Sequence, residues 1–287
     1  MAQTQQEIEH GLNEGENQVV STLPIREGWW KPFVLFQGCW LTPQAAESVK
    51  VAQTQFQPRP DDIILATYPK CGTTWLKALA FTIELEVLPT PRILTTHLPI
   101  ALQPSGISTL GCRVVYLCRE PKVVLVSTWH YMNKVREDFH IDLDMTFEFF
   151  CEGFSIFGPI WEHCLGYWKQ SMVEPDRILF LKYNDMMADL IKHVKMLAEF
   201  LQVPFSKEEE SAGVVEEVVR LCSFKNLKSL PVNSSGVGDR IGDLPMQNSA
   251  FFRSAKVGDW RDHLTEEMAK KLDSIIVDKL KGSGLVL

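Results

Sequence analysis

The chain has 287 residues, of which 45% are hydrophobic and 23% are charged, a composition that excludes disordered and fibrous proteins. Its formal net charge is −7 and it has no long basic block, which argues against a nucleic-acid partner but permits a local basic pocket for a small anion. No apolar run approaches the roughly 20 residues that would span a membrane. The seven cysteines are scattered without a CxxC pair, so they predict reduced thiols in a cytoplasmic protein without a zinc site.

Residues 1–20 are polar and acidic and predict a mobile leader, ahead of a single domain over residues 21–287. Within this domain, the pair Thr42-Pro43 supplies an N-cap and a first-turn proline for a helix that ends near Gln55. The stretch 233–248 is rich in glycine and serine and predicts a long flexible loop.

Four short, nearly all-apolar runs predict the strands of a buried parallel sheet. These runs are Ile63–Tyr68, Arg92–Thr96, Arg113–Cys118 and Arg177–Lys182. Helical patterns lie between and after them, at Thr73–Ile83, Lys122–Arg136, Phe147–Gly153, Pro159–Ser171, Met187–Leu201, Glu208–Cys222 and Glu266–Lys281. The alternation predicts an α/β fold in which helices flank one central parallel sheet.

The segment Tyr68–Trp75, YPKCGTTW, has the composition of an anion-binding loop and follows the first strand directly. Such a turn presents backbone N–H groups, the start of the next helix adds a positive dipole, and Gly72 permits close approach of the backbone. Lys70 adds a full charge, although it precedes the glycine, so the segment is no Walker A loop. From these residues alone, phosphate binding competes with a plain strand-to-helix turn that a threonine caps.

Residues 69–75, PKCGTTW, closely resemble the 5′-phosphosulfate loop of the cytosolic sulfotransferases, which transfer a sulfuryl group from 3′-phosphoadenosine 5′-phosphosulfate (PAPS). Three further segments resemble that family in the same order along the chain: YLCR with STWH, then LKYND, then FR followed by GDW. The similarity runs from about residue 60 to 281, and FGPIWEHCLGYWKQS looks like the plant soluble branch. The resemblance implies a strand–loop–helix phosphate site like that of the P-loop kinases.

The resemblance implies two anion pockets, one for each end of the donor. The donor-binding residues that it implies are Lys70, Cys71, Gly72, Thr73, Thr74, Trp75, Arg119, Ser127, Tyr183, Phe224, Arg253 and Lys256. The loop at the start of this set would hold the 5′ end, where Lys70 would also neutralise the bridging oxygen as the S–O bond breaks. The arginines with Ser127 would bind the 3′-phosphate, and the aromatic residues would flank the adenine.

His97 follows the second strand run in the sequence THLP, at the edge where open α/β sheets place their sites. A single histidine at a strand end is usually structural. The resemblance makes it the general base that takes the proton from the acceptor hydroxyl, and an imidazole that titrates near neutrality suits this role. The other six histidines, His130 among them, receive no role.

The chain departs from the family pattern at three places. Only 22 positions separate Trp75 from His97, where the family usually has several dozen residues, and ELEVLPTPR reads like two family segments joined abruptly. This favours a chain that lacks residues of the natural protein over an unusually open acceptor pocket. Ser254-Ala255 replaces Lys-Gly and removes a cation, which Lys256 is placed to supply. Glu266 replaces the usual valine of the dimer motif, so we expect a monomer or a weak homodimer.

These features together predict a PAPS-dependent sulfotransferase that acts without a metal on a small hydroxylated, apolar metabolite and releases adenosine 3′,5′-bisphosphate. His97 and Lys70 are its predicted catalytic residues. A nucleotide-dependent small-molecule kinase is the enzymatic alternative, and the missing Walker A loop argues against it. The third alternative is a degenerate protein that binds the nucleotide without turnover. The acceptor stays open among flavonoids, steroids, phenolic hormones and other hydroxylated metabolites.

Overall fold

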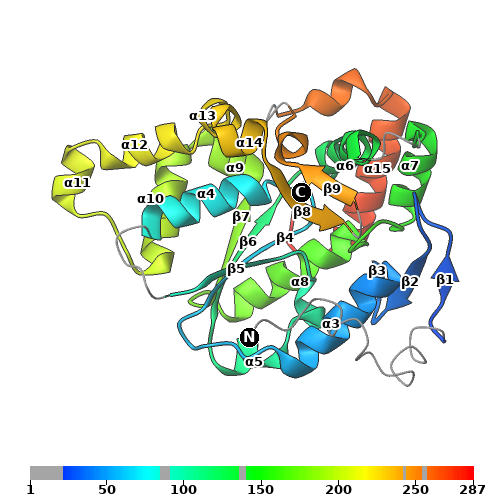
Figure 1. The fold of residues 1–287 in the computed structure, drawn as a ribbon, viewed down its shortest axis with the longest axis horizontal. Coiled ribbons are helices and arrows are strands. Elements are labelled where there is room, and N and C mark those ends of the chain that lie inside the picture. Colours follow the sequence, from blue (N-terminus) through cyan, green and yellow to red (C-terminus); the bar gives the residue numbers. More distant parts are fainter. Residues whose placement is uncertain (1–21, 85–90, 136–139, 242–243, 254–256) are drawn as a thin grey trace, which may run out of the picture.

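The computed structural model describes residues 22–84, 91–135, 140–241, 244–253 and 257–287. The predicted leader over residues 1–20 lies outside this part of the chain. Figure 1 shows an α/β fold, with a parallel sheet at the centre and helices on both of its faces. This is the predicted fold class.

The central sheet has the strand order β5-β4-β6-β7, and every pair in it is parallel. Its strands, β4 (Ile63–Thr67), β5 (Ile93–Thr96), β6 (Arg113–Cys118) and β7 (Ile178–Lys182), coincide with the four predicted runs to within one residue at each end. Every residue of β4 is buried, because this strand lies inside the sheet and helices cover both of its faces.

Two hydrophobic layers hold the sheet between the helices. Along β4, Ile64 and Ala66 face one layer, whereas Ile63 and Leu65 face the other, as the two-residue period of a strand requires. The first layer is covered by α6 (Pro121–Val135), α7 (Leu143–Cys151), α8 (Ile160–Val173) and α15 (Glu266–Leu280) (Figure 1). The second is covered by α4 (Thr73–Glu84), α9 (Tyr183–Ala188), α10 (Leu190–Leu201) and α12 (Val214–Leu221).

A small antiparallel sheet of β1 (Ile25–Arg26), β2 (Phe33–Phe36) and β3 (Cys39–Leu41) precedes helix α3 (Pro43–Gln55). The α3 helix begins and ends as predicted, and the Thr42 hydroxyl accepts a hydrogen bond of 3.2 Å from the N–H of Ala45. The remaining short helices are η1 (Ile100–Leu102), α5 (Ser105–Thr109), α11 (Lys207–Ser211), α13 (Phe224–Ser229), α14 (Pro231–Ser234), η2 (Asn248–Phe251) and η3 (Asp259–Asp262).

Two predicted helices are each divided in the structure. The predicted helix over 187–201 is interrupted at Asp189, whose side chain caps α10 by accepting from the N–H of Lys192. The predicted helix over 208–222 is interrupted at Gly213, whose φ of 79° is left-handed and ends one helix before the next begins. At Asp189 the hydrophobic period continues across the break, so the sequence pattern hides it, whereas the helix before Gly213 has the polar sequence KEEES and buries no residue.

The predicted loop over residues 233–248 is wrong in its conformation. It contains a hairpin of β8 (Val237–Ile241) and β9 (Leu244–Gln247), which pair in antiparallel fashion. Ser234 and Ser235 precede the hairpin and Gly238 lies within β8, so glycine and serine in this stretch do not exclude strands. None of the described helices has the length and apolar character needed to cross a membrane.

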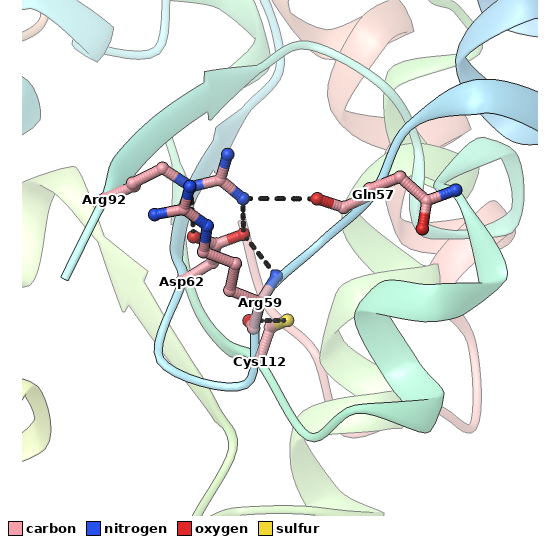
Figure 2. Close-up of polar contacts among 5 residues, drawn as sticks. All are labelled: Gln57, Arg59, Asp62, Arg92 and Cys112. Atoms are coloured by element: carbon pink, nitrogen blue, oxygen red, sulfur yellow. Dashed lines mark hydrogen bonds and ion pairs between the residues drawn. The ribbon is translucent and has the colours of Figure 1, made fainter. Parts of the chain in front are cut away.

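An ion pair between the chain segments that enter β4 and β5 fixes the end of the sheet opposite to the loops that follow these strands (Figure 2). Asp62, fully buried, accepts from Arg92 Nε at 2.7 Å and Nη2 at 2.6 Å, and from the Arg59 N–H at 2.8 Å. Burial alone would raise the pKa of this carboxyl, but the hydrogen bonds from Arg92 and Arg59 outweigh it and lower the pKa. The pair therefore ties β5 to β4 at the point where the chain returns from α4.

We expect Asp62→Asn to lower the melting temperature at neutral pH by about 5 °C, because the amide cannot replace the charged, bidentate partner of Arg92. The exposed neighbouring residue supplies the matched control, Asp61→Asn, which should change little. Because the pKa of Asp62 is lowered by folding, its stabilisation is present at neutral pH and is lost as the pH falls through its folded pKa, below about 4. Equal melting curves for the two variants would contradict this role.

Candidate active site

The predicted site residues from four different strand ends lie along one edge of the central sheet. The parallel register pairs Ala66 with Thr96 and Thr67 with Leu117, so β4, β5 and β6 end together. The loop that contains Lys70 follows β4, His97 follows β5 and Arg119 follows β6, and Tyr183 begins α9 directly after β7. This carboxyl edge is where open α/β sheets bind their ligands.

The loop after β4 has the conformation that an anion-binding turn needs. Lys70 and Gly72 have positive φ values of 68° and 105°, and α4 begins at Thr73. A side chain at Gly72 would lie 3.3 Å from the ring of Tyr183, so the close packing here favours glycine. The Thr73 and Thr67 hydroxyl oxygens lie 2.6 Å apart. Thr74, the residue after Thr73, is half-buried.

Cys71, also predicted in the donor-binding set, is fully buried beneath the loop, and its N–H donates to the Tyr68 carbonyl over 3.2 Å. Burial raises the pKa of its thiol well above the ordinary value. Cys71 therefore contributes to this site through its backbone and its packing rather than through a thiolate.

Lys70 lies in an unusually positive environment. Burial, followed by the charges of Arg253, Arg119 and Lys134, lowers the pKa of its ammonium group from 10.5 to about 7. Its Nζ atom lies 3.9 Å from the ring centroid of Tyr131. Cations that share a desolvated region raise each other's free energy, and an anion bound between them reverses this repulsion. The arrangement therefore favours a ligand with several negative charges.

A pocket of about 200 Å³ opens beside Lys70, and it brings three of the predicted residues together. Ser127 reaches it from α6 and Arg253 from the segment after η2. Arg253 forms an ion pair of 2.5 Å with Asp259, while its buried Nε has no hydrogen-bond partner in the described part of the chain. This buried donor suits an oxygen of a bound anion. Lys256, with Ser254-Ala255, lies outside the described residues.

The predicted aromatic residues lie in two separate contacts. Trp75 and Tyr183 meet edge to face with centroids 5.3 Å apart, and the guanidinium of Arg119 lies 4.2 Å from the Tyr183 centroid. Phe224, at the start of α13, instead packs against Phe252, a residue of the pocket wall, at 5.9 Å.

His97 is held in a defined tautomer. Its Nδ1 lies 2.8 Å from the Thr67 carbonyl oxygen, which can only accept, so Nδ1 carries the hydrogen and Nε2 carries the lone pair. Burial and the charges of Lys70 and Lys77 lower its pKa, against the opposing effect of the Thr67 hydrogen bond. The imidazole is therefore neutral at neutral pH and can accept a proton at Nε2.

The sequence analysis missed four residues of this region. His130, Tyr131 and Lys134 line the pocket, and their spacing of three, four and seven residues from Ser127 places them on the same face of α6. That period was the signal that could have found them. His163, from α8, donates from Nε2 to the His97 carbonyl over 3.0 Å, and no local sequence pattern indicates this contact.

The model of the sulfotransferase domain family matches this chain over residues 60–87 and 82–284. The chain belongs to the sulfotransferase family. The two matched stretches of this sulfotransferase overlap at residues 82–87, and residues 84–87 of this overlap begin the segment ELEVLPTPR, where the sequence analysis finds two family segments joined. This sulfotransferase is therefore an enzyme of the sulfuryl-transfer class, as its sequence predicts.

Two curated relatives come from plants. Cytosolic sulfotransferase 5 of Arabidopsis thaliana is 38% identical over 316 aligned residues, which cover 96% of this sulfotransferase and 97% of the relative. The alignment is longer than the 287 residues of this chain, so the relative has residues with no counterpart here. Flavonol 4′-sulfotransferase of Flaveria chlorifolia is 39% identical, with 88% of this chain and 89% of the relative covered.

The fold also resembles a solved structure, that of mouse sulfotransferase SULT7A1 in complex with PAP. The TM-score is 0.71 at 24% identity, and the match covers 88% of this sulfotransferase and 95% of the mouse chain. Among the described residues of this sulfotransferase, no group of three or more His, Cys, Asp or Glu side chains could hold a metal ion.

Titration of the histidine resonances by NMR tests the electrostatics of the site. We expect His97 to titrate below the ordinary histidine value of 6.5. Lys70→Met should move the His97 midpoint upward, because it removes a nearby positive charge. A His97 midpoint at or above 6.5 in the wild type would contradict the described environment.

Proposed function

We propose that this sulfotransferase uses PAPS as its donor and transfers the sulfuryl group to the hydroxyl of a small, apolar metabolite, with His97 as the general base. The observation that carries this proposal is the juxtaposition of a neutral, oriented imidazole with a cluster of partly buried cations around Lys70 at one sheet edge. A donor with two separated phosphate groups needs such a cluster, and an acceptor hydroxyl needs a base beside it.

The residues fit the two ends of the donor. Lys70, Gly72 and the threonines at the start of α4 would hold the 5′-phosphosulfate, as backbone donors at a helix N-terminus do for phosphates. Ser127 and Arg253 line one pocket and would hold the 3′-phosphate together with Arg119. The unpartnered Nε of Arg253 supports this assignment, as does the PAP bound to the mouse sulfotransferase, which is the adenosine 3′,5′-bisphosphate left after transfer.

The aromatic residues would hold the adenine. Trp75 and Tyr183 already contact each other, and Phe224 would close the other side of the base through its contact with Phe252. We also propose Lys256 as a donor-binding residue, and this assignment rests on the sequence alone.

In the proposed reaction PAPS, when bound, supplies the activated sulfuryl group, and the chain supplies a base and a cation. His97 accepts the hydroxyl proton of the acceptor at Nε2, while the Thr67 carbonyl holds Nδ1–H and keeps the ring in place. The ammonium group of Lys70 stabilises the negative charge that develops on the leaving phosphate oxygen during in-line displacement at sulfur. The deprotonated acceptor oxygen forms the new O–S bond as the bond to the phosphate oxygen breaks.

An apolar acceptor fits the surroundings of His97. The ring centroid of Phe157 lies 5.8 Å from that of His97, and Phe157 is half-buried. The least exposed aromatic residues between Trp29 and Trp40 belong to the hydrophobic core rather than to an acceptor pocket. Trp29 is one of them, and its indole N–H donates a hydrogen bond to the Phe154 carbonyl. The flavonol acceptor in the name of the Flaveria relative and the cytosolic location in the name of the Arabidopsis relative support a polyphenol-like acceptor and a cytoplasmic enzyme.

Lys70→Ala should abolish sulfation and weaken the binding of adenosine 3′,5′-bisphosphate, whereas Lys77→Ala, which removes an exposed lysine of the following helix α4, should retain both. In the wild type we expect this affinity to fall above about pH 7, by at most about tenfold per pH unit, because the empty pocket then contains neutral Lys70. Calorimetric titration across this range measures the slope. Lys70→Arg should flatten it, and an unchanged slope in that variant would contradict the assignment.

His97→Ala should lower kcat by at least about 10²-fold and leave bisphosphate affinity nearly unchanged, because a general base acts only on the acceptor's proton. His97→Gln can form a hydrogen bond but cannot accept the proton, so it should not restore the rate. Steady-state sulfation with labelled PAPS measures both. A folded His97→Ala protein with near-normal kcat would remove His97 from the reaction, and binding of the bisphosphate without sulfated product in the wild type would favour the degenerate alternative.

A further inference from the structure

Two histidines meet at the wall of the nucleotide pocket. His130 lines the pocket from α6, one turn after Ser127, and His263 follows η3 near the other end of the sequence. Their Nε2 atoms lie 3.2 Å apart, and their ring centroids are separated by 4.6 Å at an angle of 77°. Neither residue has a role in the reaction proposed above.

A pair of imidazoles in this geometry can take up one proton. At 3.2 Å one Nε2 must carry a hydrogen and the other must accept it, so the neutral pair shares a single hydrogen bond. Each neutral ring already has one N–H, so one added proton gives the pair a third N–H and a full positive charge. A second added proton would set two cations in contact, which strong repulsion opposes.

The charged groups around His130 disfavour its protonated form while the pocket is empty. These charged groups come from four parts of the fold: Lys70 after β4, Lys134 on α6, Arg253 after η2 and Asp259 on η3. Burial, followed by the charges of Arg253 and His263, lowers the pKa of His130 to about 4, while Asp259 acts in the opposite direction. An anion in the pocket would outweigh the like charges and favour the protonated pair.

We propose that the His130–His263 pair takes up one proton from solvent when the 3′-phosphate of the nucleotide enters this pocket, and that the charged pair then donates a hydrogen bond to the phosphate. The inference rests on the proposed function, because it needs the bisphosphate in this pocket. The affinity for the nucleotide then depends on pH, because the added positive charge of the histidine pair exists only in the bound state. Binding strengthens as the pH falls, and release of the bisphosphate is favoured as the pH rises.

Calorimetric titration with adenosine 3′,5′-bisphosphate at about pH 6, in two buffers of different ionisation enthalpy, counts the protons taken up. At this pH Lys70 is charged before and after binding, so it adds nothing to the count. The ligand's own phosphate proton contributes equally to wild type and variants. We expect the wild type to take up about one proton more than His130→Gln, whose affinity should be about tenfold weaker near pH 6 and little changed near pH 8.

His193→Gln is the matched control, because His193 lies on α10 and does not line the pocket, and it should behave as the wild type. If His130→Gln does not fold, His263→Gln tests the same pair, and an NMR titration of the wild type should show a histidine midpoint that rises above about 6 with saturating bisphosphate. Equal proton uptake in the wild type and a folded pair variant would overturn this inference alone. A wild type that does not bind the bisphosphate would overturn the proposed function with it.

Discussion

The parallel pairing of β4 with β5 and β6 is the constraint on which the active site depends. It makes the strands end together, so that the lysine loop, His97 and Arg119 emerge side by side although they come from three separate parts of the chain. Hydrophobic layers on both faces hold the strands in register. At the opposite end, the buried Asp62 with Arg92 fixes β5 against β4. This ion pair therefore helps to keep the sheet edge, and His97 upon it, in place.

Burial and closely spaced positive charges disfavour the charged forms of several side chains near this edge. Burial and neighbouring cations hold Lys70, His97 and His130 nearer to their neutral forms than exposed side chains would be. For His97 this is the state that a base needs. For Lys70 and His130 it is a state that a polyanionic ligand reverses, since bound phosphates replace repulsion among cations with attraction. Under the proposed function, nucleotide binding is thereby coupled to proton binding at this site.

The sequence predicts the strands and the phosphate loop well because both are local patterns. The two inner strands β4 and β6 are almost entirely buried, so their continuous apolar runs stand out, and the lysine loop carries glycine and threonines at fixed positions. The hairpin after α14 was missed because its composition is that of turns. The break at Gly213 was missed because residues on both sides of the glycine favour helix. The His130–His263 contact joins residues 133 positions apart, which only tertiary packing brings together.

The most direct test of the account is the transfer of radiolabelled sulfuryl from PAPS to a panel of flavonols, steroids and other plant hydroxyl metabolites by the purified protein. The account predicts a labelled product with at least one apolar acceptor, dependent on Lys70 and His97, together with stoichiometric release of adenosine 3′,5′-bisphosphate. Tight binding of the bisphosphate with no labelled product from any acceptor would contradict it. So would phosphate transfer from ATP in place of sulfuryl transfer from PAPS.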